Sequence, residues 1–272
     1  MPLPAPAPDA AVVVTGASSG IGAAVARELG RRGHPMVLVA RSGDALADLA
    51  AELRALSGQD AAVHALDLGT DADLAAAREL VDDDRVAGVV NAAGFGVTGR
   101  VAELADVQAA LDGLVRVNVL ALHSLTVAAV GALVRRAAAD ARPGAILNVS
   151  SITAFQPLPG AASYAASKAF VQSFSEAVHT ELAGTGVTLT TLSPGLTRTG
   201  FADAAGTDFG RAPDLVVGEA ADVAAAGVEA MVRGDRSVTP GLVNQLTALG
   251  GRLAPRTLLL PALDAGMDLY GA

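Results

Sequence analysis

Short, almost wholly apolar runs alternate along the chain with longer stretches rich in alanine and leucine. An apolar run without polar alternation is typical of a strand buried on both faces of a parallel sheet, and the longer stretches have the length of crossover helices. The pattern therefore predicts repeated βαβ units and a doubly wound α/β sheet. The predicted strands are residues 11–15, 36–40, 61–66, 86–91, 145–150 and 187–193, with a short strand near 237–239.

The chain is expected to form one domain with additions at both ends. Its 272 residues suffice for one large α/β core but not for two. Residues 1–10 alternate proline with small apolar residues and are predicted to form a flexible tail. The domain then comprises residues 11–272. Its strand pattern breaks before a helix near residues 219–232, so residues 200–218 are a candidate substrate lid.

Residues 242–272 form a leucine-rich, proline-interrupted segment at the carboxyl end. Three roles are open for it: covering a site in the domain, docking on another subunit, or contact with a membrane surface. It contains few basic residues, and interfacial helices usually carry many. The membrane is therefore the least favoured role, and we interpret this segment as part of a substrate or oligomer contact.

The composition excludes several classes of protein. Apolar residues make up 51% of the chain and charged residues 17%, a balance that favours a large buried core over disorder. The net charge of −9 has the wrong sign for general binding to nucleic acid. The chain has no cysteine, which removes disulfides, thiolate metal sites and cysteine nucleophiles and is compatible with a cytoplasmic protein.

One uncharged run, residues 117–134, raises the question of a membrane span, because the mean hydropathy of the chain is +0.45. A span needs about 20 apolar residues. This run is shorter, and Asn118, His123, Ser124 and Thr126 interrupt it. We predict a buried or subunit-interface helix here, and no membrane span.

The clearest candidate for chemistry is a tyrosine–lysine pair. Lys168 is the only lysine among 19 basic residues, and it stands four residues after Tyr164, one of two tyrosines. On a helix this spacing places both side chains on one face. A tyrosine hydroxyl has an ordinary pKa of about 10, and a neighbouring ammonium group favours the phenolate. We therefore expect Lys168 to lower the pKa of Tyr164 and make it an acid–base group.

A glycine-rich turn lies between the first predicted strand and a helical run, with the spacing G-x-x-x-G-x-G. Side chains at the glycine positions would obstruct the turn or the approach of a phosphate, and the N–H groups and dipole at the helix start attract an anion. The turn is therefore a candidate site for the pyrophosphate of a dinucleotide. Its candidate binding residues are Gly16, Ser18, Ser19, Gly20, Ile21 and Gly22.

Further motifs follow in order along the chain. They are Asn91-Ala92-Ala93-Gly94 after the fourth strand, Asn118 in the next helix, Ser150-Ser151 after the fifth strand, Tyr164-Ala165-Ala166-Ser167-Lys168, and Pro194-Gly195 after the sixth strand. Together with the glycine turn, they resemble the short-chain dehydrogenase/reductase family in its compact single-domain form. The resemblance covers residues 11–199. It implies a Rossmann-type sheet of about seven parallel strands in the order 3-2-1-4-5-6-7, with helices on both faces.

The resemblance also implies the roles of four catalytic residues. Tyr164 would give or take the proton of a carbonyl or alcohol oxygen, and Lys168 would lower its pKa and bind the nicotinamide ribose. Ser151 stands thirteen residues before Tyr164 and would bind the substrate oxygen. We interpret Ser150 as a turn residue at the end of a strand. Asn118 would hold a helix kink and a water molecule that leads to the lysine.

The remaining motif residues are expected to bind the cofactor. Asp67 and Leu68 resemble the pair that meets the adenine ring, with Asp67 accepting a hydrogen bond from its amino group. Capping of the next turn by Asp67 is the alternative. The segment from Asn91 to Gly94 would run beneath the adenine ribose. The residues that resemble the segment closing over the nicotinamide are Pro194, Gly195, Leu196, Thr197 and Thr199.

The end of the second predicted strand favours NADP(H) over NAD(H). An acidic residue there would bind the ribose hydroxyls of NAD and repel a 2′-phosphate. This chain has Arg41 and Ser42 instead, and a guanidinium group suits a phosphate dianion. Ser18 and Ser42 are expected to assist. Because Ser19 stands where a second basic residue is common in the family, NAD(H) stays an alternative cofactor.

The resemblance places apolar segments on the substrate side. These are residues 95–97, residues 152–160 with Phe155 and Leu158, and Phe201 in the candidate lid. We therefore expect a bulky or apolar carbonyl compound or alcohol as the substrate. The four histidines show no metal-ligand spacing, and no metal is expected.

Three functions of different classes are compatible with the motifs. The intact catalytic set favours an NADP(H)-dependent oxidoreductase that interconverts a ketone or aldehyde and an alcohol. The alternatives are a non-catalytic NADP-binding regulator and an isomerase, epimerase or dehydratase with a tightly bound nucleotide. Members of the family are commonly dimers or tetramers, and the uncharged faces of residues 117–134 and 170–183 favour a homodimer or homotetramer.

Overall fold

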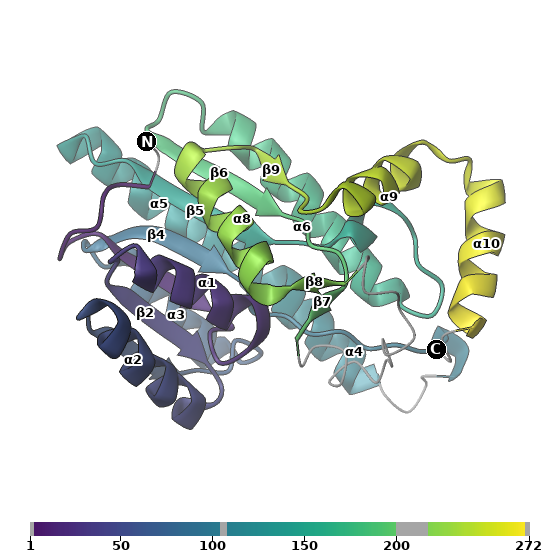
Figure 1. Cartoon of the computed structure of the whole chain (residues 1–272), viewed down its shortest axis with the longest axis horizontal. Coiled ribbons are helices and arrows are strands. Elements are labelled where there is room, and N and C mark those ends of the chain that lie inside the picture. Colours follow the sequence, from purple (N-terminus) through teal and green to yellow (C-terminus); the bar gives the residue numbers. More distant parts are fainter. Residues whose placement is uncertain (1–2, 104–107, 200–216, 270–272) are drawn as a thin grey trace.

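The computed structural model describes residues 3–103, 108–199 and 217–269. Seven parallel strands form one sheet in the order β3-β2-β1-β4-β5-β6-β9, which confirms the predicted topology (Figure 1). Each strand end lies within one residue of its prediction. The strands are β1 (Ala11–Thr15), β2 (Met36–Ala40), β3 (Ala61–Ala65), β4 (Val86–Asn91), β5 (Gly144–Val149), β6 (Val187–Leu192) and β9 (Ser237–Val238).

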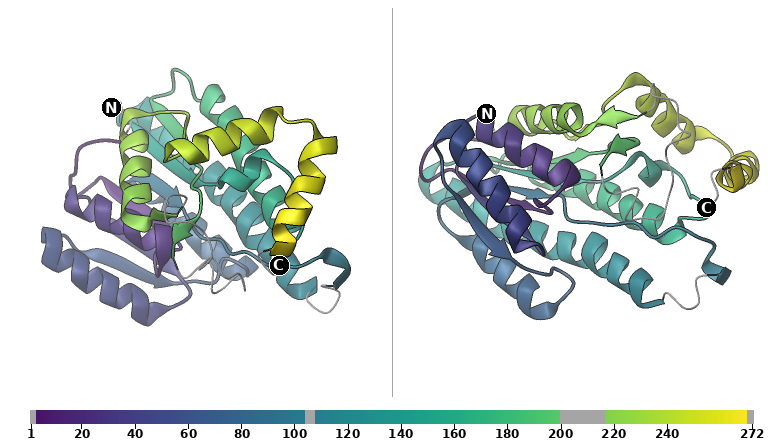
Figure 2. Two further views of the ribbon diagram at one scale, coloured as in Figure 1. Left: turned by 45° about the vertical axis from the view of Figure 1, so that its right-hand side comes forward. Right: turned by 60° about the horizontal axis from the view of Figure 1, so that its bottom comes forward.

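Helices cover both faces of this sheet (Figure 2). Successive residues of one strand enter opposite cores: Val12 and Val14 pack beneath one helix layer and Val13 beneath the other. Both faces are buried, and for this reason the central strands are mostly apolar. One layer contains α1 (Gly20–Arg31), α2 (Gly43–Ser57) and α8 (Ala220–Arg233), and the other contains α3 (Asp71–Asp82), α5 (Leu122–Asp140) and α6 (Ala162–Glu181).

A long helical stretch continues from α4 (Gln108–Val115) through the π-helical segment η3 (Arg116–Ala121) into α5. Its 33 residues are long and apolar enough to cross a membrane by length and composition alone. A core helix passes the same test, and the buried face of α5 packs on β4 and β5. Leu125 and Ala129 lie on this buried face, whereas Leu120 and Val127 are exposed.

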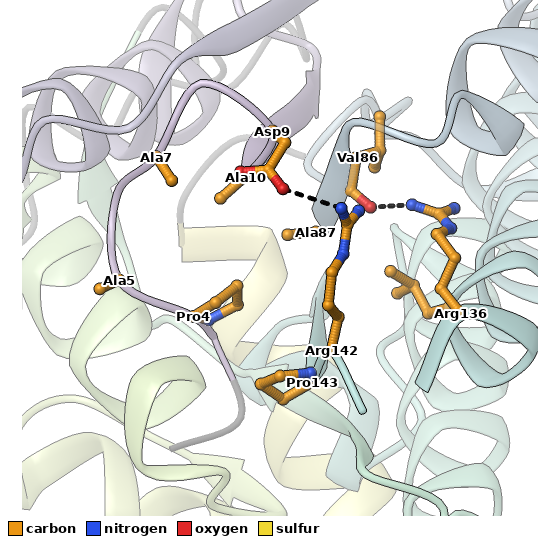
Figure 3. A pocket seen from close by; sticks show the side chains of 11 residues that line it. Pro4, Ala5, Ala7, Asp9, Ala10, Val86, Ala87, Arg136, Arg142 and Pro143 are labelled. Atoms are coloured by element: carbon orange, nitrogen blue, oxygen red, sulfur yellow. Dashed lines mark hydrogen bonds and ion pairs between the residues drawn. The ribbon is translucent and has the colours of Figure 1, made fainter. Parts of the chain in front are cut away.

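Residues 3–10 lie against the amino ends of the strands. Leu3 is buried in the core under α1 and α8, and Arg142 donates a hydrogen bond to the carboxylate of Asp9 (2.9 Å). A cavity of about 80 Å³ opens beside this segment, and the guanidinium groups of Arg136 and Arg142 line it (Figure 3). Residues 3–10 are therefore packed on the domain, whereas the sequence predicts a flexible tail for residues 1–10.

The loops after the carboxyl ends of β1, β4, β5 and β6 meet at the opposite edge of the sheet. Around them lie the short helices η1 (Val101–Glu103) and η4 (Ile152–Phe155), and a two-stranded sheet of β7 (Thr197–Arg198) and β8 (Gly218–Glu219). Helices α9 (Leu242–Leu253) and α10 (Arg256–Leu269) follow β9. Most of the candidate lid, residues 200–216, lies outside the described residues.

Candidate active site

Tyr164 and Lys168 lie one turn apart on α6, as their spacing predicts. The Lys168 Nζ atom is 5.7 Å from the centre of the Tyr164 ring and donates a hydrogen bond to the backbone oxygen of Val149 (3.0 Å). The side chains of Tyr164 and Ser151 are hydrogen-bonded. Three of the four predicted catalytic side chains therefore meet at the carboxyl end of β5.

Burial controls the charge of this pair. It raises the pKa of Tyr164 to about 12, against the smaller opposite effect of the hydrogen bond with Ser151. It also lowers the pKa of Lys168 to about 8. The net pKa of Tyr164 is therefore raised and not lowered as the sequence predicts, because desolvation disfavours the phenolate. Tyr164 is thus held in the neutral form, which can donate a proton.

Asn118 lies within the π-helical segment η3, where the resemblance implies a kink. Its amide oxygen accepts from the backbone N–H of Phe95 (3.1 Å), and its Nδ2 atom donates to the backbone oxygen of Phe95 (3.0 Å) and to Ser167 Oγ (3.2 Å). The Ser167 hydroxyl in turn donates to the backbone oxygen of Tyr164 (2.7 Å). Asn118 therefore ties the loop after β4 to the helix turn that carries the catalytic pair.

Ser167 stands between Tyr164 and Lys168 but is not among the residues that the sequence motifs predict to be functional. A polar residue on the buried face of that turn was the available signal. Ser150, which we interpreted as a turn residue, donates its hydroxyl to the backbone oxygen of Lys168 (2.9 Å). Both serines hold the backbone of the catalytic turn, while Ser151 alone hydrogen-bonds the tyrosine side chain.

Two glycines of the turn after β1 have no room for a side chain. A Cβ atom on Gly16 would lie 2.7 Å from the backbone nitrogen of Ala93, and one on Gly22 would lie 2.2 Å from the oxygen of Gly16. Gly16 also has a φ of 67°, in the left-handed region that glycine adopts readily. Ser19 precedes α1 without capping its backbone N–H groups. A close backbone cradle with uncapped donors fits the pyrophosphate of a dinucleotide.

The segment from Asn91 to Gly94 lies directly against this turn. The Thr15 hydroxyl accepts hydrogen bonds from the backbone N–H groups of Ala92 (3.2 Å) and Ala93 (3.3 Å). Gly94 faces the catalytic residues, since a Cβ atom there would lie 2.9 Å from Asn118 Oδ1. Backbone of the fourth βα loop therefore connects the candidate cofactor cradle to the catalytic group.

Asn91 is buried and links strands. Its Nδ2 atom donates to Asn148 Oδ1 (2.9 Å) and Thr126 Oγ1 (3.2 Å), and Asn148 Nδ2 donates to Ser175 Oγ (2.9 Å). Asn91 and Asn148 are paired in register on β4 and β5. Thr126, Asn148 and Ser175 could not be predicted from the sequence, since no local pattern signals a contact between residues so far apart. This network supports the floor of the site.

The predicted adenine end of the site is exposed. Arg41 makes no hydrogen bond or ion pair with any other described residue, so its guanidinium group is available to an anion. Ser42 caps α2 by accepting from the N–H of Ala45 (3.4 Å). Asp67 Oδ1 accepts from the N–H of Gly69 (2.9 Å), which is the turn-capping alternative. Leu68, beside it, is buried.

The predicted nicotinamide segment runs between the substrate loop and the glycine turn. The N–H of Ile152 donates to the backbone oxygen of Pro194 (2.9 Å), and the Thr197 hydroxyl donates to the oxygen of Gly195 (3.0 Å). Thr199 lies beside the glycine turn, because a Cβ atom on Gly20 would lie 3.4 Å from its side chain. Leu196 accepts a backbone hydrogen bond from the start of β8. The structure therefore places this segment beside both the glycine turn and the loop that follows Ser151.

The apolar segments expected around the substrate are partly occupied by the protein itself. The N–H of Gly99 donates to the oxygen of Gly160 (2.7 Å) and joins the two segments. Phe155 is buried, and the guanidinium carbon of Arg252 on α9 lies 4.4 Å from its ring centre. Phe155 is therefore covered by α9 and is not the open wall that we expected. Phe201 lies outside the described residues.

Comparison with known proteins agrees with this geometry. The model of the short chain dehydrogenase family matches residues 10–209. An uncharacterised oxidoreductase of Staphylococcus epidermidis is 32% identical over 223 residues, 81% of this chain and 90% of the relative. The chain belongs to the short chain dehydrogenase family and is an oxidoreductase of that family.

Two solved structures have the same fold over nearly the whole chain. A short-chain dehydrogenase from Sphingobium yanoikuyae in complex with NADPH has a TM-score of 0.78 and 33% identity, covering 93% of this chain and 95% of that one. The bulky-bulky ketone specific alcohol dehydrogenase from Comamonas testosteroni has a TM-score of 0.74 and 28% identity, covering 95% and 93%. A nicotinamide cofactor is therefore the class that this site takes.

Proposed function

We propose that this protein is an NADP(H)-dependent oxidoreductase that interconverts a ketone or aldehyde and an alcohol, with Tyr164 as its acid–base residue. The convergence of Tyr164, Ser151, Lys168 and Asn118 beside a glycine cradle carries the proposal. Nothing in this arrangement favours a regulator without turnover or an isomerase.

Each catalytic side chain has a separate role in carbonyl reduction. The bound cofactor would supply the hydride that adds to the carbonyl carbon, and would accept it in the reverse direction. Ser151 donates a hydrogen bond to the substrate oxygen. This oxygen then lies between the hydroxyl groups of Ser151 and Tyr164. The Tyr164 hydroxyl, neutral because of its raised pKa, transfers its proton to that oxygen as negative charge develops there.

The proton transfer leaves a tyrosinate that Lys168 stabilises. Its pKa of about 8 keeps most of the side chain charged at neutral pH, and its ammonium group lies beside the ring. Asn118 acts through position, because it holds the backbone of Tyr164 through Ser167. A proton from solvent then restores the neutral tyrosine.

The preference for NADP(H) rests on Arg41 at the end of β2. Its guanidinium group is exposed, and the position carries no acidic residue that would repel a 2′-phosphate. Ser42 and Ser18 lie in the neighbouring loops and would assist. The NADPH complex of the Sphingobium yanoikuyae relative supports the same assignment.

We assign a bulky or apolar ketone or its alcohol as the substrate class. Phe95, Val97 and Leu158, which are half-buried and not covered in the way that Phe155 is, would supply the apolar surroundings. The Comamonas testosteroni neighbour is named for bulky-bulky ketones, and its fold covers almost all of this chain. Turnover of only the small, charged compounds in a panel of ketones, aldehydes and alcohols would contradict this assignment.

A homodimer through α5 and α6 is part of the proposal. Phe170 and Phe174 stack with ring centres 5.6 Å apart, and His123 lies 5.0 Å from Phe174. Val127 and Phe170 are exposed, and His123, which stands one helix turn before Val127 on α5, lies with its ring centre 6.2 Å from that of Phe170. An apolar face of this kind on two long helices suits an isologous contact. Val127→Glu would place a charge in that contact and reduce the mass of the particle in light scattering.

Turnover by Tyr164→Phe tests the catalytic assignment. Absorbance at the reduced-nicotinamide band would be followed with NADPH and NADH across ketones, aldehydes and secondary alcohols. We expect the variant to lose about 10²–10⁴-fold in kcat, the usual value of a positioned acid, while its Kd for NADPH stays unchanged. Wild-type turnover by Tyr164→Phe would overturn the assignment.

A further inference from the structure

Helix α9 has its polar and apolar faces reversed relative to an ordinary surface helix. Its inner face, which packs on the domain, consists of Asn244, Ala248 and Gly251. Its outer face carries four leucines that are between 52% and 73% exposed. These are Leu242, Leu246, Leu249 and Leu253.

The spacing of the four leucines is that of a helix-pairing seam. They follow one another at intervals of four, three and four residues, the a/d pattern with which one helix packs lengthwise on another. Scattered exposed leucines are common on protein surfaces, but a continuous stripe marks an interaction site. The seam of α9 therefore needs a partner surface.

Helix α10 also lacks a surface to pack against in the described part of the chain. It extends from the end of α9 at the margin of the molecule (Figure 1), and no residue from Arg256 to Gly266 is buried. Leu258 is exposed and Pro261 lies inside the helix. Asp264 forms an ion pair with Arg100 (3.0 Å). A helix of this length that buries no side chain between Arg256 and Gly266 is marginal in water, so another surface is needed to support it.

The charges of this arm, defined as residues 242–269, favour a protein partner over a lipid surface. The arm has two arginines and two aspartates, and so no net charge, although the whole chain carries −9. Binding to anionic lipid relies on a surplus of Lys and Arg, which the arm lacks. Two neutral arms can approach each other without the repulsion that opposes contact elsewhere between two acidic copies.

We propose that this arm docks on the arm of a second copy of the same chain, with the leucine seams of the two α9 helices packed against each other. Between Leu242 and Gly266 the arm exposes 17 residues, which approaches the about 20–30 residues that each side contributes to a stable interface. The contact is isologous, so both copies use the same surface.

This contact also bears on the active site. The inner face of α9 contacts two loops at the carboxyl end of the sheet: Gly251 packs on Phe155 and Gln156, and Asn244 packs on Gly195. A second copy that covers the outer face of α9 stabilises the position of α9 against these loops. The leucine seam of α9 shares no residue with the α5 and α6 face, so a particle that uses both contacts contains four chains with dihedral symmetry.

Leu246→Glu with Leu249→Glu tests the interface, because two carboxylates in the seam would be buried on both copies. Light scattering after size exclusion should show half the wild-type mass for the double variant. Leu56→Glu is the matched control, since Leu56 is a 49% exposed leucine on α2, and it should keep the wild-type mass. A monomeric wild type, or a double variant with the wild-type mass, would overturn the proposal.

A second measurement does not depend on disrupting the seam. The chain has no cysteine, so Leu249→Cys introduces a single thiol near the middle of α9. Mild oxidation should give a disulfide-linked dimer, whereas Leu56→Cys should stay monomeric on a denaturing gel. Equal crosslinking of the two variants, or binding of the wild type to phosphatidylcholine and phosphatidylserine vesicles in place of self-association, would refute the interface. Both readouts are independent of the proposed reaction.

Discussion

Lys168 is a buried ammonium group whose pKa falls from 10.5 to about 8 on burial. A base with a lowered pKa in the folded state binds fewer protons there than in the unfolded chain, so stability rises between about pH 8 and pH 10.5. Below about pH 8 the lysine is charged in both states, so the folded protein carries the full cost of burying the ammonium group. The shift corresponds to about 3 kcal/mol, and the hydrogen bond to Val149 offsets about 1 kcal/mol.

We therefore predict that Lys168→Met is more stable than the wild type at pH 7, by about 2 kcal/mol, although it loses activity. The difference should shrink as the pH rises from about 8 towards 10.5, because the lysine of the folded wild type is then neutral and no longer carries the cost of burying a charge. Urea unfolding of both proteins at a series of pH values measures it. A gap that does not change with pH would show that the lysine is not desolvated.

Arg41 is expected to make a single charged contact with the 2′-phosphate of NADPH. Its loss should remove one charge-assisted hydrogen bond, which contributes about 1.5–3 kcal/mol, or about 10–100-fold in affinity for NADPH. We predict that Arg41→Ala raises the Kd for NADPH by this factor and leaves the Kd for NADH nearly unchanged. Arg54→Ala, an exposed arginine at the end of α2, is the control. Equal weakening of both cofactors would remove Arg41 from the specificity site.

At the scale of elements, α9 acts as a clamp on the loop after β6. A Cβ atom on Gly195 would lie 2.2 Å from Asn244 Oδ1, so the two residues fill one space. Gly195→Ala should destabilise the fold by about 1–3 kcal/mol through overpacking. Asn244→Ala in the same chain should recover most of this loss.

Urea unfolding of the two single variants and the double variant gives the coupling energy between these positions. We expect it to exceed about 1 kcal/mol, the range of residues in direct contact. Additive effects would mean that α9 does not rest on this loop in solution.

The elements themselves were predictable where local periodicity decides them. Every strand of the large sheet lies within one residue of its predicted position, and Tyr164 and Lys168 share a helix turn. The pattern did not show that β3 is an edge strand with Ala62 and Val63 exposed, because an apolar run looks the same in the centre of a sheet and at its margin. The small sheet of β7 and β8 was also missed, since its strands have two residues each.

At the scale of the whole molecule, the amino-terminal segment closes the edge of the sheet opposite the active site. Leu3 is buried against α1 and α8, and large-to-small changes of a buried leucine usually cost about 2–5 kcal/mol. We predict that Leu3→Ala lowers the free energy of unfolding by at least about 2 kcal/mol. Leu56→Ala, at an exposed position, should change it by less than about 0.5 kcal/mol. An equal effect of the two substitutions would show that residues 3–10 are detached in solution.

The sequence by itself determined the alternation of strands and helices, the glycine cradle and the spacing of Tyr164 and Lys168. These features depend on periodicity and on neighbours a few residues apart, so they are visible without a fold. The family resemblance supplied the strand order and the candidate roles of Ser151 and Asn118.

Only the tertiary structure decided the contacts between distant residues. Asn118 reaches Phe95 and Ser167, Asn244 rests on Gly195, and Leu3 enters the core. No local pattern signals such pairs, because chain folding alone brings them together. The raised pKa of Tyr164 belongs to the same class, since it follows from how much water the surrounding elements exclude and not from the lysine four residues away.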